Sequence, residues 1–254
     1  MKSGKIDNSQ LIRLKNKDYL DKQKVAAVVL KETMQLLSEN YKKLSLLELD
    51  KLAGDNIIKN NCIPTFKNYK GFPGNICISV NNQLVHGIPK DYYLKQNDIV
   101  TFDFGVTYLG AIVDSARTFN YDNKDQKIID LINTTKKCLK ESIDQIKIGD
   151  NIGTIGYTIN KIATNNLFNV ITNYGGHGLC WNTAHAQPFI SNKSNKDEGI
   201  RIVPGLTIAI EPLLCIGNPK TFLDKDGWTV YTQGMNCHEE DSIFITENGV
   251  EILT

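Results

Sequence analysis

The sequence lacks the features that mark several common classes of protein. Its 29 basic and 28 acidic residues leave a formal net charge of +1, so no strong attraction to nucleic acid or to a membrane surface is expected. No stretch approaches the roughly 20 apolar residues that span a bilayer. The first twenty residues, rich in Lys, Asn and Asp, contain no apolar run of the kind found in signal peptides. We therefore expect a cytoplasmic protein that binds neither DNA nor a membrane.

Paired cysteines are also missing. The six cysteines show no CxxC spacing, which excludes the usual zinc-finger pattern. In a chain of this size without an export signal, we expect them to be reduced thiols, mostly in the core. The 254 residues and the 41% hydrophobic content suffice for one large core, or for two halves that share one.

Hydrophobic periodicity predicts two helices followed by strands, and then the same order again. The expected helices cover residues 18–41, 46–57 with Ser45 as N-cap, 124–146 and 152–168. The expected strands cover residues 76–80, 99–106, 111–119, 206–210, 228–232 and 240–246. No Pro-, Gly- or Ser-rich linker separates the two halves. We therefore expect one α+β domain over residues 1–254.

Two aspartates occupy neighbouring apolar strands. Asp103 lies between Phe102 and Phe104, where a charge is unfavourable unless it is compensated. If the two strands form a hairpin with Tyr108-Leu109 at its tip, Asp103 faces Asp114 with Cβ atoms about 4.5–5.5 Å apart. Like charges at that distance repel unless a cation lies between them or one is protonated. A divalent metal is the simplest remedy. The alternative is structural, with one Asp capping the turn and the other paired with Arg117.

Further candidate ligands follow in the second half. Glycines flank His177, which allows a backbone or a ligand to approach the imidazole closely. Glu211 ends an apolar strand before Pro212, and Glu240 opens the last strand. Four carboxylates and one imidazole would balance two divalent cations. Such a donor set suits Mn, Fe(II), Co or Zn and could lower the pKa of a bridging water. A lone histidine or an exposed acid is more often structural, and Glu239 in particular could be a solvated turn acid.

The ordered motifs Val-His86-Gly-Ile-Pro, Phe-Asp103-Phe, Val-Asp114, Gly-His177-Gly, Ile-Glu211-Pro and Glu240 resemble the type I methionine aminopeptidases, over most of the chain from about residue 12. The resemblance implies the pita-bread fold, with two pseudo-symmetric halves, a curved antiparallel sheet covered by helices and a dinuclear metal site at the centre. It also implies five ligands to two divalent metal ions, with Asp114 and Glu240 bridging. These ligands are Asp103, Asp114, His177, Glu211 and Glu240.

The same resemblance implies a reaction and its partners. A metal-activated hydroxide would attack the first peptide bond of a nascent chain and release an N-terminal methionine that precedes a small residue. Glu211 would accept the proton of the water, while His86 and His185 would act in catalysis and contact the substrate. The implied walls of the methionine pocket are Tyr69, Phe72, Cys77 and Trp228; plain core packing is the alternative, above all for Cys77. The implied enzyme is a monomer with transient ribosome contact.

The sequence departs from the family pattern in a few places. His177 and His185 are eight positions apart, one more than is usual, and no aromatic residue directly precedes His185. Position 239 is Glu where an aromatic is common, and position 241 is Asp where His is common. Three other interpretations stay open: a proline-specific aminopeptidase or dipeptidase of the same fold, a pita-bread binding module without activity, and a protein in which structural acids merely bind a divalent ion.

Overall fold

The computed structural model describes residues 12–254, and its helices occur in two pairs, as the periodicity predicted. The helices are α1 (Lys17–Asn40), α2 (Leu46–Lys59), α3 (Gln126–Asp144) and α4 (Gly153–Asn165). Ser45 caps α2: its Oγ accepts the Glu48 backbone N–H at 3.3 Å, and its own N–H donates to the Glu48 carboxylate at 2.8 Å. None of the described helices is long and apolar enough to cross a membrane.

The strands pair antiparallel throughout the described residues. The strands of the first half are β1 (Ile63–Pro64), β2 (Cys77–Val80), β3 (Gln83–Val85), β4 (Ile99–Tyr108) and β5 (Ala111–Asn120). Those of the second half are β6 (Asn169–Val170), β7 (Gly175–Cys180), β8 (Thr183–Ser191), β9 (Thr207–Ile210), β10 (Leu213–Cys215), β11 (Phe222–Leu223), β12 (Val230–Tyr231), β13 (Asn236–His238), β14 (Glu240–Thr246) and β15 (Gly249–Ile252).

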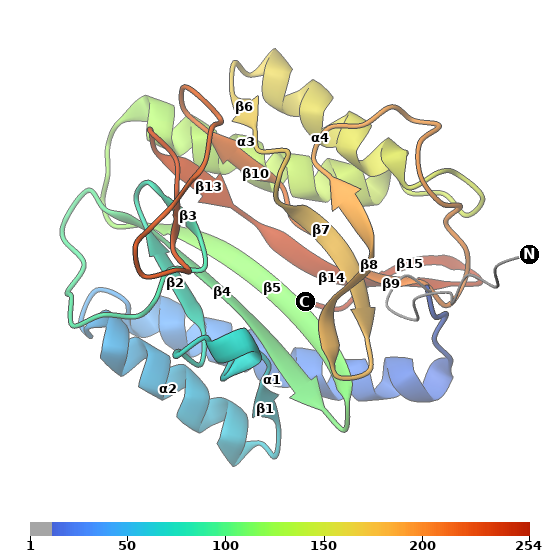
Figure 1. Ribbon diagram of the computed structural model, residues 1–254, viewed down its shortest axis with the longest axis horizontal. Helices are drawn as coiled ribbons and strands as arrows, with labels where there is room; N and C mark the ends of the chain where they lie inside the picture. The colour runs from blue at the N-terminus through green and yellow to red at the C-terminus, as the bar shows by residue number, and fades with distance from the viewer. Residues whose placement is uncertain (1–11) are drawn as a thin grey trace, which may run out of the picture.

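A nine-stranded sheet holds the two halves together within residues 12–254. Its main path runs β1-β4-β5-β14-β9-β7-β8, with β2 added beside β4 and β15 beside β14. Two smaller sheets have the orders β13-β10-β6 and β11-β12-β3. Figure 1 shows α1 with α2 and α3 with α4 as two separate pairs with the strands between them. Strand β14, the latest of the central strands in sequence, lies between β5 and β9, so both halves build one continuous sheet.

Each helix pair buries its own apolar face. One cluster joins α1 and α2 to β4 and β5 through side chains such as Leu30, Leu49 and Phe102, all 2% exposed or less. A second cluster joins α3 and α4 to β9 and β14 through side chains such as Ile155 and Ile208. The expected α+β fold with two similar halves is confirmed. Burial of these two apolar faces fixes the sheet, and with it the strands that carry the acids.

Glycines beside His177 allow strand β7 to lie unusually close to its neighbours. A Cβ on Gly178 would overlap the carbonyl oxygen of Gln187, and one on Gly176 would overlap that of Ala209. The glycines beside His177 thus allow the backbones of β8 and β9 to approach β7 closely. We expect Gly178→Ala to lower the free energy of unfolding by about 2 kcal/mol or more, because the backbone would have to shift. Urea denaturation measures this, with the exposed Thr183→Ala in the same hairpin as control; equal stability of the two variants would contradict the expectation.

Candidate metal centre and active site

The hairpin of β4 and β5 brings Asp103 and Asp114 together, but not in the predicted register. Asp103 lies opposite Ala116, and Asp114 lies opposite Gly105. The tip of the hairpin is Leu109-Gly110, whose φ angles of 46° and 84° match a two-residue turn with both central residues left-handed. The direct pairing of the two aspartates was therefore wrong by two positions. A shift of two keeps both side chains on the same face, so they become diagonal neighbours.

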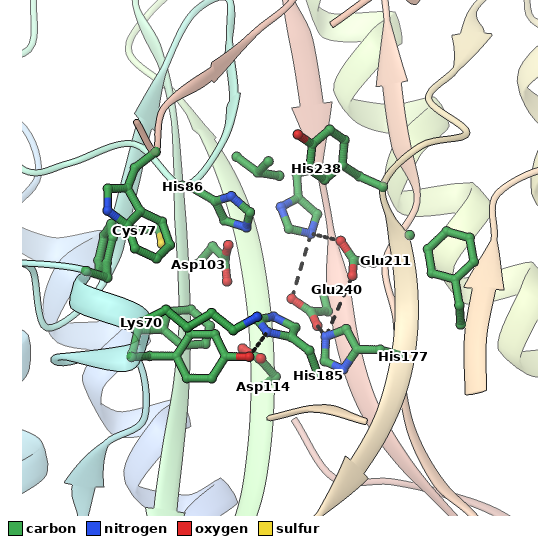
Figure 2. A pocket seen from close by; sticks show the side chains of 18 of the residues that line it. Lys70, Cys77, His86, Asp103, Asp114, His177, His185, Glu211, His238 and Glu240 are labelled. Atoms are coloured by element: carbon green, nitrogen blue, oxygen red, sulfur yellow. Dashed lines mark hydrogen bonds and ion pairs between the residues drawn. The ribbon is translucent and has the colours of Figure 1, made fainter. Parts of the chain in front are cut away.

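The five predicted ligand positions meet at one point of the fold. Strands β4, β5 and β7 carry Asp103, Asp114 and His177, Glu211 directly follows β9, and Glu240 begins β14. Ligand atoms of Asp103, Asp114 and Glu240 all lie within 4.8 Å of one another, and so do those of His177, Glu211 and Glu240. Glu240 belongs to both groups, which is the arrangement expected of a bridging ligand. Figure 2 shows these side chains directed toward a common space.

Burial shifts the protonation of the four carboxylates. It raises the pKa of Asp103 to about 7, and burial followed by the charge of Asp103 raises that of Glu211 to about 8. Burial and the neighbouring carboxylates raise the pKa values of Asp114 and Glu240 well above the ordinary range. Four ionised acids therefore need cations among them, and Oε1 of Glu240 has no hydrogen-bond partner among the described residues. The donor set fits divalent metal ions with oxygen and imidazole ligands.

His177 completes the donor set as a neutral imidazole. Burial lowers its pKa to about 3, so it keeps a free lone pair at neutral pH, which metal ligation requires. Its Nε2 lies 3.7 Å from Oε1 of Glu211 and 3.9 Å from Oε1 of Glu240. Atoms at these separations can surround one cation without touching each other.

Arg117 serves the site without pairing with either aspartate. Its guanidinium forms an ion pair with Asp241 and also donates to the carbonyl of Glu240. Ser115 Oγ–H donates to the same carbonyl at 2.8 Å. The structural alternative, in which Arg117 neutralises Asp103 or Asp114, is therefore wrong. The unusual Asp at position 241 has a role, because its pair with Arg117 fastens β14 to β5 beside Glu240.

A cavity of about 380 Å³ opens above the acids. All four predicted pocket residues, Tyr69, Phe72, Cys77 and Trp228, line it together with His86. Phe72 and Trp228 meet edge to face with ring centroids 5.2 Å apart. An apolar wall beside a group of carboxylates and imidazoles suits a substrate with one apolar side chain next to the bond that reacts.

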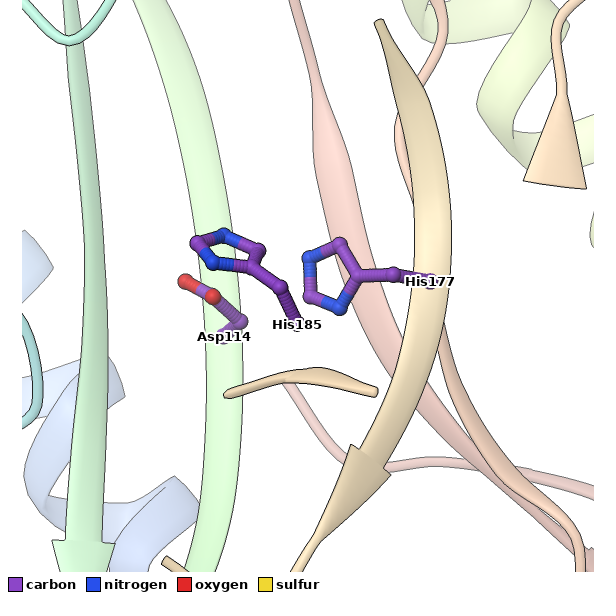
Figure 3. A group of neighbouring side chains, drawn as sticks. All are labelled: Asp114, His177 and His185. Carbon is purple, nitrogen blue, oxygen red and sulfur yellow. The ribbon is translucent and has the colours of Figure 1, made fainter. Parts of the chain in front are cut away.

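His185 reaches the site despite the extra residue before it. Irregular pairing in the β7–β8 hairpin absorbs that residue, and the His185 ring centroid lies 4.6 Å from that of His177. Its Nδ1 lies 3.4 Å from the Tyr69 hydroxyl. Figure 3 shows the His185 ring between Asp114 and His177, and ligand atoms of the three lie within 4.8 Å of one another. His185 therefore lies beside Asp114 and His177 at the candidate metal centre.

Sequence reasoning missed two buried groups. His238, which was given no role, lines the cavity and is 1% exposed. It stands two positions before Glu240, and alternation along an extended chain places such residues on the same side; this spacing was the available signal. Glu239 is 2% exposed rather than solvated, and accepts the Thr118 backbone N–H at 3.2 Å. Its burial raises its pKa to about 7.

Comparison with known proteins decides the family. Residues 19–247 match metallopeptidase family M24. The chain belongs to this family. It is 39% identical over 248 residues to a methionine aminopeptidase from Mycoplasma capricolum, covering 96% of this chain and 98% of that relative. It is 35% identical to one from Clostridium perfringens, covering 96% and 99%. The resemblance drawn from the ordered motifs is therefore confirmed.

Solved structures support the same grouping within this M24 metallopeptidase family. A methionine aminopeptidase from Thermotoga maritima matches with a TM-score of 0.93 and 32% identity, covering 96% of this chain and 99% of that one. A prolidase from Pyrococcus furiosus matches with a TM-score of 0.73 and 18% identity, and only 66% of it is covered. The second likeness shows a shared fold alone. The chain is a metal-dependent hydrolase of the pita-bread fold.

Proposed function

We propose that this protein is a methionine aminopeptidase that removes the initiator methionine from nascent chains whose second residue is small. The observation that carries the proposal is the meeting of five metal-ligand positions at the base of a cavity with an apolar wall. Relatives of nearly the same length carry this name.

The chain would hold two divalent ions at these five positions. The close groups Asp103, Asp114 and Glu240 and His177, Glu211 and Glu240 would supply their ligands. When bound, such ions ionise water near neutral pH and polarise the carbonyl of the scissile bond.

The remaining steps belong to side chains. Glu211, which lines the cavity beside the other ligand positions, accepts a proton from the attacking water and passes it to the leaving nitrogen. His86 and His185 also line the cavity and orient the peptide. Phe72 and Trp228 contact the methionine side chain, whose sulfur packs favourably against aromatic rings.

A substrate test separates this proposal from a proline-specific enzyme of the same fold. The purified protein is stripped of metal, reloaded with Mn, Fe(II), Co or Zn, and offered Met-Ala-Ser and an Ala-Pro peptide. We expect free methionine from the first peptide only. Asp103→Ala and Glu240→Ala are expected to lower the rate of methionine release by a factor on the order of 10³ or more. Each change removes a metal ligand, and metal ions stabilise the transition state by several kcal/mol.

The matched control is Glu247→Ala, which removes an exposed acid from the turn after β14 and is expected to keep the wild-type rate. Turnover of the proline peptide alone, or of neither peptide with any of the four metals, would contradict the proposal.

Other parts of the expectation remain predictions from the sequence. They are the action on chains at the ribosome, the cytoplasmic location, the monomeric state and the organisation of residues 1–254 as a single domain. Sedimentation velocity of the purified protein measures the oligomeric state, and co-sedimentation with ribosomes measures the contact.

A further inference from the structure

His238 is a buried imidazole without a partner. It ends β13, is 1% exposed and lines the cavity. Neither its Nδ1 nor its Nε2 has a hydrogen-bond partner among the described residues. Buried polar groups are nearly always paired, because an unpaired one is destabilising. A histidine in this place therefore indicates a partner that forms in the working site.

The distances show which groups that partner can be. Glu211 and Glu240 lie between two imidazoles (Figure 2). His177 faces the Oε1 atom of each, whereas Nε2 of His238 lies 3.5 Å from Oε2 of Glu211 and 3.7 Å from Oε2 of Glu240. His238 thus faces the carboxylate oxygens that point away from the cation position beside His177.

Of the two carboxylates that face His238, that of Glu211 is held less firmly by its own backbone. Glu240 begins a central strand, and its backbone carbonyl accepts from Ser115 and Arg117. Glu211 lies in the short connection between β9 and β10, outside either strand. The pairing of β10 with β13 sets Leu213 opposite His238, which holds the imidazole at a fixed place relative to Glu211, two residues earlier.

We propose that His238 is a positioning residue whose Nε2–H donates to Oε2 of Glu211, and so orients the oxygen that accepts the proton of the attacking water. This inference rests on the role of Glu211 in the proposed function. A small rotation of either side chain closes the gap from 3.5 Å to an ordinary hydrogen bond of about 2.9 Å. Partners of this kind around metal-ligating carboxylates fix their orientation.

The carboxylates facing the imidazole are Glu211 and Glu240, and one N–H at Nε2 is enough for the proposed hydrogen bond, so no charge on the ring is required. A neutral donor can be replaced by another neutral donor of similar reach. Glutamine is therefore the conservative substitution, whereas leucine fills the space without donating.

The test compares His238→Gln with His238→Leu in the Co- or Mn-loaded enzyme. We expect the leucine variant to lose about 10- to 100-fold in kcat, with KM and the metal Kd from calorimetry within about threefold of wild type. The glutamine variant should retain most of the kcat. Cys237→Ala, which truncates the neighbouring buried side chain outside the cavity, is the control and should keep the wild-type kcat.

A second measurement does not depend on turnover. In Zn-loaded protein with ¹⁵N-labelled histidine, the His238 Nε2 should carry a proton whose resonance shifts in Glu211→Gln. If the wild type releases no methionine, the proposed function fails while this spectrum still tests the hydrogen bond.

Three outcomes would overturn the inference. The first is a leucine variant with wild-type kcat, and the second is a glutamine variant as slow as the leucine variant while both fold. The third is a large loss of metal affinity in both variants, which would make His238 a ligand instead. Thermal unfolding of each variant reports whether it folds.

Discussion

Replacing Glu211 with glutamine is expected to lower kcat for methionine release by a factor of about 10² to 10⁴. This is the range that a positioned general base contributes. Glutamine keeps the shape of the side chain and one oxygen, but it cannot accept the proton. Steady-state kinetics at saturating metal measures the effect, with metal content determined on the same samples.

The matched control for this change is Glu239→Gln. Glu239 is as well buried as the site acids but lies outside the cavity, and glutamine can still accept the Thr118 backbone N–H. Its kcat should stay within about threefold of wild type. A Glu211→Gln enzyme that retains more than a tenth of the wild-type kcat would show that another group accepts the proton.

The metal-free protein is expected to lose stability as the pH rises from about 7 to about 8.5. The pKa of Asp103 is raised from 3.8 to about 7 and that of Glu211 from 4.5 to about 8, so the folded state keeps protons on these acids that the unfolded state has lost. Stability from these acids is fully present below their unfolded pKa values and is lost as the pH passes the folded ones. The buried histidines oppose this trend only below about pH 6.5, because burial lowers the pKa values of His177 and His238 to about 3 while the unfolded histidines are protonated there. We expect the Tm in EDTA to fall by roughly 3 °C or more between about pH 7 and 8.5.

Bound metal should reverse that trend, because deprotonated carboxylates bind cations more tightly and binding stabilises the folded state. Scanning calorimetry at about pH 7, 7.75 and 8.5 measures how the Tm changes with pH, once with EDTA and once with Zn. Asp103→Asn removes one of the titrating groups, so its Tm in EDTA should depend less on pH. A metal-free Tm that increases from about pH 7 to 8.5 would contradict the expectation.

The elements that could be predicted from the sequence are those whose signals are local. The capping residues Ser45 and Glu48 define the start of α2, and apolar runs on both sides of Asp103 define β4. A metal site was one of two interpretations of two acids in adjacent apolar strands, and the resemblance to the aminopeptidases favoured it over the structural one. The metal interpretation survived a register error, because a shift of two residues leaves both side chains on one face.

What could not be predicted depends on contacts between distant segments. The register depends on a turn with Leu109 at a φ of 46°, a conformation that leucine seldom adopts. Arg117 lies close to Asp114 in sequence, yet its partner is Asp241, more than a hundred positions later. Glu239 and Glu240 look alike in sequence, but the surrounding sheet makes Glu239 a buried neighbour of Thr118 and places Glu240 beside both groups of candidate ligands. The spacing of His238 from Glu240 could be read from the sequence, but its place beside Glu211 depends on the pairing of β10 with β13.

The central position of β14 has a consequence for biosynthesis. Strand β5 ends at Asn120, while its neighbour in the sheet begins at Glu240, so the first half of a growing chain is made long before the strand that joins it to the second. Until β14 pairs with β5 and β9, the site lacks Glu240, the carboxylate that we propose both metal ions share. A ribosome-bound chain halted before β14 would therefore not hydrolyse peptides. In a series of longer chains, activity would first appear at the length at which β14 can pair with β5 and β9.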